Sequence, residues 1–274
     1  MHTFQRDSVE ERAKTIRKLT VDCIGKLGIG HIGGCLSIAD LLAVLYNAVM
    51  NIDPQNPKMP GRDRLIISKG HAGPALYAAL ADKGYFSISE LDTLNRPGTG
   101  LPSHCDMNKT TGVDMTTGSL GQGFSCAVGA AIGAKLRKDN AIIYTIIGDG
   151  ESQEGQIWEA AMLAGHRRLG NLIAFTDYNH MQIDGTTNEV NTLDNLPAKW
   201  AAFNWNVVDV AQGNDVEKIY DAILQPKQCG DKPTMIILHT VKGKGVSFIE
   251  AAGCGNHNMP VTPEQYWQAL LELS

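Results

Sequence analysis

Two stretches of this sequence place oxygen-bearing side chains directly after predicted buried strands. Asp149 stands in "GDGE", after the apolar run "AIIYTII" at residues 141–147, and Asn179 follows the next predicted strand, "LIAFTD" at 172–177. Because one predicted helix separates the two strands, we expect Asp149 and Asn179 to face each other across adjacent strand ends. Carboxylate and amide oxygens are hard donors that suit Mg²⁺ or Ca²⁺ rather than copper. The pair predicts a divalent metal site that a diphosphate would complete.

Each of these residues also has an ordinary interpretation, since Asp-Gly after a strand is usually a turn. The occurrence of both at one strand–helix–strand spacing favours the ligand interpretation. Gly148 and Gly150, with a helix predicted to start near Glu154, would offer backbone N–H groups to an anion.

Four of the eight histidines lie in loops punctuated by glycine or proline, in "GIGHIGG", "SKGHAG", "GLPSHCD" and "GCGNHNMP". They are His31, His71, His104 and His257. Loops held by a rigid scaffold carry much of protein function, and the near-neutral pKa of histidine suits proton transfer. His166 and His239 lie within predicted regular elements and are interpreted as structural.

Three familiar motifs are excluded by their context. The glycines of Gly28–Gly33 have the G-x-G-x-x-G spacing, but they follow a predicted helix, whereas a dinucleotide site requires a strand there. "GKGVS" lacks the first glycine of a P-loop, and no G-x-S-x-G nucleophile elbow occurs.

The elements that must position these residues alternate regularly along the chain. Continuous apolar strands between helices predict a doubly wound α/β fold, with a mostly parallel sheet and helices on both faces. No composition break marks a linker, so residues 1–274 are predicted to form one domain. Ser37 is predicted to cap a helix over 38–50. The other predicted helices cover 9–27, 121–138, 156–168, 197–203, 215–224 and 262–273, the remaining strands 64–68, 206–210 and 234–240, and a long loop 95–118.

Composition narrows the class of protein further. The formal net charge of −5 and the lack of a basic stretch argue against nucleic acid as a partner. No secretory signal or eighteen-residue apolar run occurs, so no membrane segment is expected. The six cysteines form no C-x-x-C pair and are expected to be reduced, which predicts a cytoplasmic protein without a zinc site.

Seven ordered motifs give the chain a specific resemblance. "GHIGG", "ISKGHAGPALYA", "LPSHCD", "TTGSLGQG", "GDGESQEGQIWEA", "YNHMQIDG" and "HTVKGKGVSFIE" resemble the N-terminal, diphosphate-binding domain of transketolases. The resemblance covers nearly the whole chain. It implies the thiamine-diphosphate-binding fold, with thiamine diphosphate and Mg²⁺ (or Ca²⁺ or Mn²⁺) as cofactors.

The resemblance also implies a partner. A full transketolase is more than twice as long, and its second domain carries the glutamate that activates the cofactor's aminopyrimidine. We therefore expect the pyrimidine-binding and C-terminal domains on a separate chain, as in a split transketolase, and a heterotetramer with two copies of each subunit. The small-residue helix "SCAVGAAIGAK" could pack against a neighbouring chain or against its own sheet.

The resemblance assigns roles to individual residues of this sequence. The metal ligands would be Asp149 and Asn179 through their side chains and Met181 through its backbone carbonyl. Cofactor contacts are assigned to His71, Gly118, Leu120, Gly148, Gly150, Glu151, Asn179 and His257. Catalytic roles are assigned to His31, His104 and His257 toward the sugar and to Glu154 toward the partner's glutamate.

The implied reaction moves a two-carbon ketol unit from a ketose, expected to be phosphorylated, to an aldehyde acceptor. A 2-oxo acid dehydrogenase alpha subunit or a non-catalytic homologue would be the alternatives. The sequence leaves the sugar open, including phosphate against sulfonate. "GCGNHNMP" departs from the usual motif around His257, and Ser119 stands where many members have proline.

Overall fold

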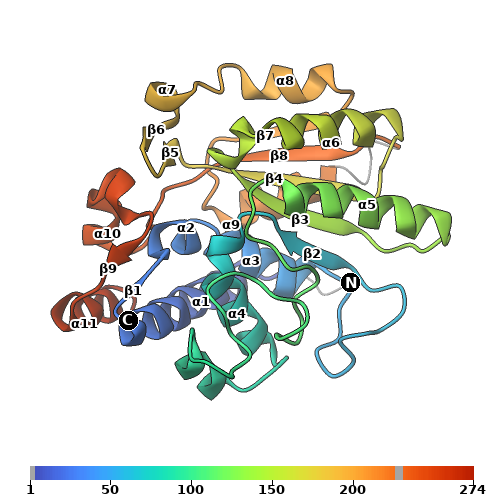
Figure 1. Ribbon diagram of the computed structural model, residues 1–274. Helices are drawn as coiled ribbons and strands as arrows, with labels where there is room; N and C mark the ends of the chain where they lie inside the picture. The colour runs from blue at the N-terminus through green and yellow to red at the C-terminus, as the bar shows by residue number, and fades with distance from the viewer. Residues whose placement is uncertain (1–3, 226–230) are drawn as a thin grey trace.

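The computed structural model describes residues 4–225 and 231–274 and centres on a five-stranded parallel sheet (Figure 1). The strand order is β2-β3-β4-β8-β7, and all neighbouring pairs are parallel. This confirms the predicted α/β fold with a parallel sheet. The strands are β2 Arg64–Ile67, β3 Ile143–Gly148, β4 Leu172–Tyr178, β7 Asn206–Val210 and β8 Thr234–His239.

Helices cover both faces of the sheet, as predicted (Figure 1). Helices α5, α6 and α8 lie on one face, and α1, α3, α4 and α9 lie on the other. The helices of the described chain are α1 Arg6–Leu27, α2 Ile32–Leu36, α3 Ala39–Val44, α4 Gly73–Lys83, α5 Gln122–Leu136, α6 Gly155–His166, α7 Thr187–Val190, α8 Leu196–Ala202, α9 Val216–Leu224, α10 Ser247–Ala251 and α11 Pro263–Glu272.

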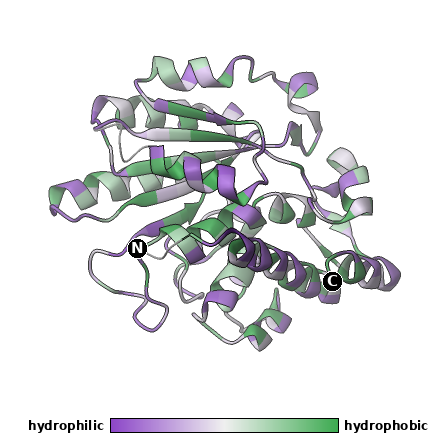
Figure 2. Cartoon of the chain, turned by 180° about the vertical axis from the view of Figure 1, so that it is seen from behind, coloured by the Kyte–Doolittle hydropathy of each residue, from purple (hydrophilic) through white to green (hydrophobic). Residues whose placement is uncertain are grey.

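Successive residues of each strand enter two different cores. In β8, Ile236 and Leu238 pack in the core beneath α1 and α9, whereas Met235 and Ile237 pack in the core beneath α5 and α6. Because side chains alternate across a strand, a sheet covered on both faces needs apolar residues at every position. Figure 2 shows green gathered on the strands and purple on outward helix faces.

The predicted helix at 38–50 differs from the structure in its start and its end. Helix α3 begins at Ala39 without a side-chain cap, and it continues into a π-helical turn, Leu45–Val49. The prediction that Ser37 is the cap is wrong. Its hydroxyl instead donates to Asp177 Oδ2 at 2.7 Å, because a buried carboxylate from the sheet stands within reach.

This same region contains the one described stretch long and apolar enough to cross a membrane, Ile32–Val49. Of that window, 83% is buried inside the fold, where it packs beside α1 and α4 as a core element.

Two short antiparallel pairs, which the sequence patterns did not predict, lie near the sheet's carboxyl edge. Strand β1, Ile29–Gly30, pairs with β9, Met259–Pro260, and thereby joins segments from opposite ends of the chain. Strand β5, Met181–Gln182, pairs with β6, Gly185–Thr186. As predicted, residues 95–118 form a long loop without a helix or strand.

Candidate active site

A cavity of about 450 Å³ opens at the carboxyl edge of the sheet. Its wall is formed by the segments that follow β2, β3, β4 and β8, together with residues from the long loop and with His31, Gly34 and His257. Every residue predicted for the site lines this one cavity: His31, His71, His104, Gly118, Leu120, Gly148, Asp149, Gly150, Glu151, Glu154, Asn179, Met181 and His257.

Asp149 and Asn179 lie at the ends of adjacent strands, as their spacing predicted. Strands β3 and β4 pair in register with Gly148 opposite Asp177, which brings the residues after them to one edge. Asp149 Oδ1 accepts from the Gly150 N–H at 2.8 Å, whereas its buried Oδ2 has no hydrogen-bond partner within the described chain. Burial, reinforced by Asp177, raises the pKa of Asp149 to about 7.

The remaining oxygen donors of the predicted metal site follow β4, with Asn179 in the turn and Met181 at the start of β5. Asn179 Oδ1 accepts from the Met181 N–H at 3.2 Å, and the Met181 carbonyl accepts from Lys242 Nζ at 3.3 Å. The described residues include no cluster of three His, Cys, Asp or Glu side chains placed for a metal. A cation bound here would therefore rely on amide and carbonyl oxygens beside Asp149, a donor set that fits Mg²⁺ or Ca²⁺. The orphaned Asp149 oxygen fits the same role.

Asp177 is a central residue of the site that the sequence patterns did not reveal. It is fully buried, and its oxygens accept from Ser37, Lys69, Asn179 and Thr240, which come from four different segments. Burial alone would raise the pKa of Asp177, but Lys69 and the surrounding donors lower it overall. The sequence feature that could have indicated Asp177 is its position as a charged residue at the end of the apolar run "LIAFTD".

Two buried lysines bring positive charge to the cavity. Lys69 Nζ donates to Asp177 Oδ2 at 2.6 Å and to the Gly34 carbonyl at 2.8 Å. Lys242 Nζ lies 3.5 Å from His257 Nδ1 in addition to its contact with the Met181 carbonyl. Burial, followed by the nearby Lys69, lowers the pKa of Lys242. Both lysines stand in glycine-rich loops of the sequence, but neither was assigned a role from it.

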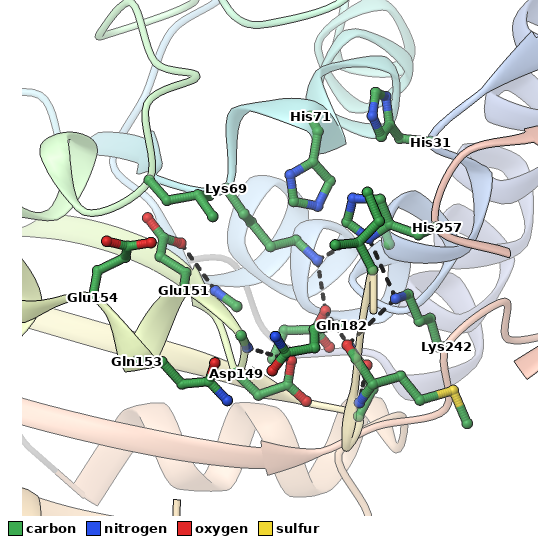
Figure 3. Close-up of a pocket in the computed structure, with 18 of the residues that line it drawn as sticks. His31, Lys69, His71, Asp149, Glu151, Gln153, Glu154, Gln182, Lys242 and His257 are labelled. Atoms are coloured by element: carbon green, nitrogen blue, oxygen red, sulfur yellow. Dashed lines mark hydrogen bonds and ion pairs between the residues drawn. The ribbon is translucent and has the colours of Figure 1, made fainter. Parts of the chain in front are cut away.

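The four loop histidines form one cluster around His31, and Figure 3 labels three of them, His31, His71 and His257. The His31 ring centroid lies 5.4 Å from that of His71, 5.7 Å from that of His104 and 5.5 Å from that of His257. Burial lowers the pKa of His31, and burial together with Lys69 lowers that of His71 well below its usual value. Burial and Lys242 lower the pKa of His257 to about 4. These three rings are therefore neutral near pH 7.

The acids after β3 have different surroundings, although both line the cavity (Figure 3). Glu154 is exposed and has no hydrogen bond to the first turn of α6. Glu151 is buried, and both of its oxygens accept from protein donors. Leu120 lines the wall with 36% of its surface exposed.

Comparisons with known proteins show the family to which this chain belongs. The family described as "Transketolase, thiamine diphosphate binding domain" matches residues 8–269. A 6-deoxy-6-sulfo-D-fructose transketolase subunit, SqwG, from Clostridium sp. (strain MSTE9) is 60% identical over 269 residues, covering 98% of this chain and 97% of that protein. An apulose-4-phosphate transketolase subunit from Phocaeicola vulgatus is 40% identical over 271 residues, covering 99% and 95%.

Solved transketolases share the same fold. The enzyme from Campylobacter jejuni superposes with a TM-score of 0.90 at 31% identity, and that from Pichia stipitis bound to sedoheptulose 7-phosphate gives 0.90 at 32%. The alignments cover 98% and 96% of this chain but only 43% and 40% of those enzymes. The chain therefore belongs to the transketolase family and carries its thiamine-diphosphate-binding domain. It aligns nearly end to end with chains that are named as transketolase subunits.

Proposed function

We propose that this chain is the diphosphate-binding subunit of a two-chain transketolase. The observation that carries the proposal is the convergence of all the predicted site residues on one cavity, at the sheet edge where parallel α/β folds bind ligands. The near end-to-end match to two named subunits supports a split enzyme. Its partner would carry the pyrimidine-binding and C-terminal domains, in a heterotetramer.

Within this cavity, Asp149, Asn179 and the Met181 carbonyl would hold a divalent cation. Support comes from the buried Oδ2 of Asp149, which has no hydrogen-bond partner within the described chain. The cation would supply positive charge to the diphosphate. Thiamine diphosphate itself supplies the electron sink for the transferred two-carbon unit.

The diphosphate would meet Lys242 and Lys69, together with His71 and the backbone at Gly150. A charge count favours this, because Asp177 forms an ion pair with Lys69, whereas within the described chain Lys242 has hydrogen-bond partners at Met181 and His257 but no ion pair. Of the two lysines, Lys242 is therefore the one whose charge is less compensated before an anion binds. A Cβ on Gly150 would stand 2.9 Å from Gln182 Cβ, which explains why a glycine lies at this wall.

The histidines would orient the sugar and move its protons. His31 and His257 have lowered pKa values, so each neutral ring can donate one hydrogen bond and accept another. Both can therefore accept a hydrogen bond from a sugar hydroxyl at neutral pH. His104 lies 5.7 Å from His31, between ring centroids, and completes the same wall.

For the donor, we propose 6-deoxy-6-sulfofructose, because the relative named for that ketose shares 60% of aligned residues. Apulose 4-phosphate is the second candidate, since the relative named for it covers 99% of this chain at 40% identity. We further propose that the protein acts in the cytoplasm, since the cysteines at positions 23, 35, 105, 126 and 254 are free; Cys229 lies outside the described residues.

The test combines the chain with its candidate partner, thiamine diphosphate and Mg²⁺, and offers 6-deoxy-6-sulfofructose, apulose 4-phosphate and fructose 6-phosphate in turn. Ketol transfer that needs both chains and prefers the sulfonated donor is the expected result. Transfer from the apulose donor alone would move the specificity to the second candidate. Asp149→Asn should abolish Mg²⁺-dependent cofactor binding, and unchanged binding would overturn the metal assignment.

A further inference from the structure

The Glu151 carboxylate joins three loops that line the cavity. Its Oε1 accepts from the Ser68 hydroxyl and from the Gly121 N–H, the latter at 2.8 Å, and its Oε2 accepts from the Gly148 N–H at 3.1 Å. Ser68 follows β2, Gly148 ends β3, and Gly121 precedes α5. Glu151 is 2% exposed, so these protein donors take the place of water around its charge.

Ser68 extends the same connection into helix α5. While its hydroxyl hydrogen points to Glu151, its Oγ accepts from the Phe124 N–H at 2.9 Å. That N–H belongs to the first turn of α5, where no residue of the helix itself can accept it. Glu151 and Ser68 therefore hold both the loop before α5 and the start of the helix.

The backbones of these loops are in close contact, as an independent observation shows. A Cβ placed on Gly123 would lie 2.6 Å from Ser68 Cα, and one on Gly70 would lie 2.7 Å from the Thr117 carbonyl carbon. Both are closer than real Cβ atoms approach other atoms. The segment 117–123 is thus pressed against the segment 68–70, and small errors in its position are not tolerated.

The geometry of this junction requires a hydrogen-bond acceptor at both side-chain oxygens of Glu151. All three partners of Glu151 donate, and a carboxylate can accept at both oxygens. A glutamine has one accepting oxygen and one donating nitrogen. It would therefore leave a buried N–H facing either Gly121 or Gly148.

We propose that Glu151, acting through Ser68, is a positioning residue that fixes segment 117–124 against the loops after β2 and β3. The inference rests on the proposed function, in which Gly148 and Gly150 meet the diphosphate while Gly118 and Leu120 meet the pyrimidine side. Glu151 then sets the separation between the two ends of the cofactor site. This differs from the direct cofactor contact that the family resemblance implies for it.

The first measurement uses the purified chain without cofactor. Hydrogen exchange in peptides covering 117–124 should accelerate by about tenfold or more in Glu151→Gln and in Ser68→Ala, while peptides from β4 keep the wild-type rate. The double variant should show less than the combined effect of the two single variants, because the Ser68–Glu151 hydrogen bond is lost in each. Glu11→Gln, which changes an exposed acid on α1, is the matched control and should exchange as the wild type does.

The second measurement uses the complex with the partner chain at saturating cofactor. The proposal expects kcat to fall about tenfold or more in Glu151→Gln with the KM for the sugar nearly unchanged, since a misplaced cofactor slows the reaction itself. A merely structural residue would reduce the folded fraction and leave kcat per folded enzyme intact.

Each of the two measurements has a result that would overturn part of the proposal. Wild-type exchange rates in Glu151→Gln would overturn the connection itself, and faster exchange with an unchanged kcat would overturn its positioning role. If the wild-type mixture shows no ketol transfer, the proposed function fails, and the exchange data still decide whether Glu151 holds the loop.

Discussion

The ammonium of Lys69 lies 2.6 Å from the carboxylate of Asp177, and each side chain is at most 2% exposed. An isolated buried charge is costly, so the two side chains depend on each other. Asp177 also accepts from Asn179, and the ion pair therefore holds a predicted metal ligand in place. The same ion pair thus contributes both to the stability of the fold and to the position of a residue in the site.

Loss of one member of this pair should destabilise the protein. Lys69→Met leaves the buried Asp177 without its cation and should lower the free energy of unfolding by about 3–5 kcal/mol. Urea denaturation of the chain would measure this. The double variant Lys69→Met/Asp177→Asn should recover part of the loss, and an equal or larger loss in the double variant would contradict the coupling.

Removal of the second buried lysine should weaken anion binding. Lys242→Met should reduce affinity for Mg²⁺-bound inorganic diphosphate about tenfold and make binding less sensitive to salt, because one charge-assisted contact is lost. Isothermal titration at two salt concentrations provides the measurement. Lys244→Met, two residues along the same loop and outside the cavity, serves as the control. Equal affinities for the two variants would count against the assignment.

The histidine cluster should make the cofactor-free protein acid-sensitive. In the folded chain the pKa of His257 is lowered from its ordinary value of 6.5 to about 4. Between these two pH values the unfolded chain therefore binds more protons than the folded chain does. Stability must therefore rise with pH in that window and be lost as pH falls through it. His31, with its lowered pKa, acts in the same direction.

Thermal melts at pH 5 and pH 7 test this dependence. His257→Gln should narrow the difference between the two melting temperatures, whereas His166→Gln, at an exposed position of α6, should leave it unchanged. A His257 variant with the wild-type pH dependence would show that the ring titrates normally.

Two glycines of helix α5 should respond to alanine in opposite directions. A Cβ on Gly123 would meet Ser68 Cα at 2.6 Å, so Gly123→Ala should destabilise by about 1–3 kcal/mol through overpacking. A Cβ on Gly129 would meet nothing within 4 Å, so Gly129→Ala should stabilise the helix by about 0.5–1 kcal/mol. Chemical denaturation of both variants gives the comparison, and a neutral Gly123→Ala would contradict the close packing.

Much of this site could be predicted because local patterns specify where strands end. Continuous apolar runs predicted all five strands of the sheet, and parallel pairing then placed Asp149 and Asn179 at one edge. The four loop histidines could also be predicted as site residues, because the glycines and prolines around them mark loops between regular elements.

Residues whose roles depend on distant partners could not be predicted in this way. Ser37 has the local pattern of a helix cap, yet its hydroxyl binds Asp177, which lies 140 positions away in sequence. Lys242 resembles any loop lysine until burial against Met181 and His257 is seen. Glu151 was assigned to the cofactor because its donors, on three separate loops, have no signature in sequence.

The pairing of β1 with β9 has a consequence for how the protein matures. It brings His31 and His257, from opposite ends of the sequence, to 5.5 Å between ring centroids. Contacts over such separations form late, because a long stretch of chain must be ordered before they are gained. A nascent or half-folded chain thus lacks the complete histidine cluster. A ligand that contacts both His31 and His257 therefore binds the folded chain in preference to the unfolded chain. Such binding stabilises the folded chain by mass action.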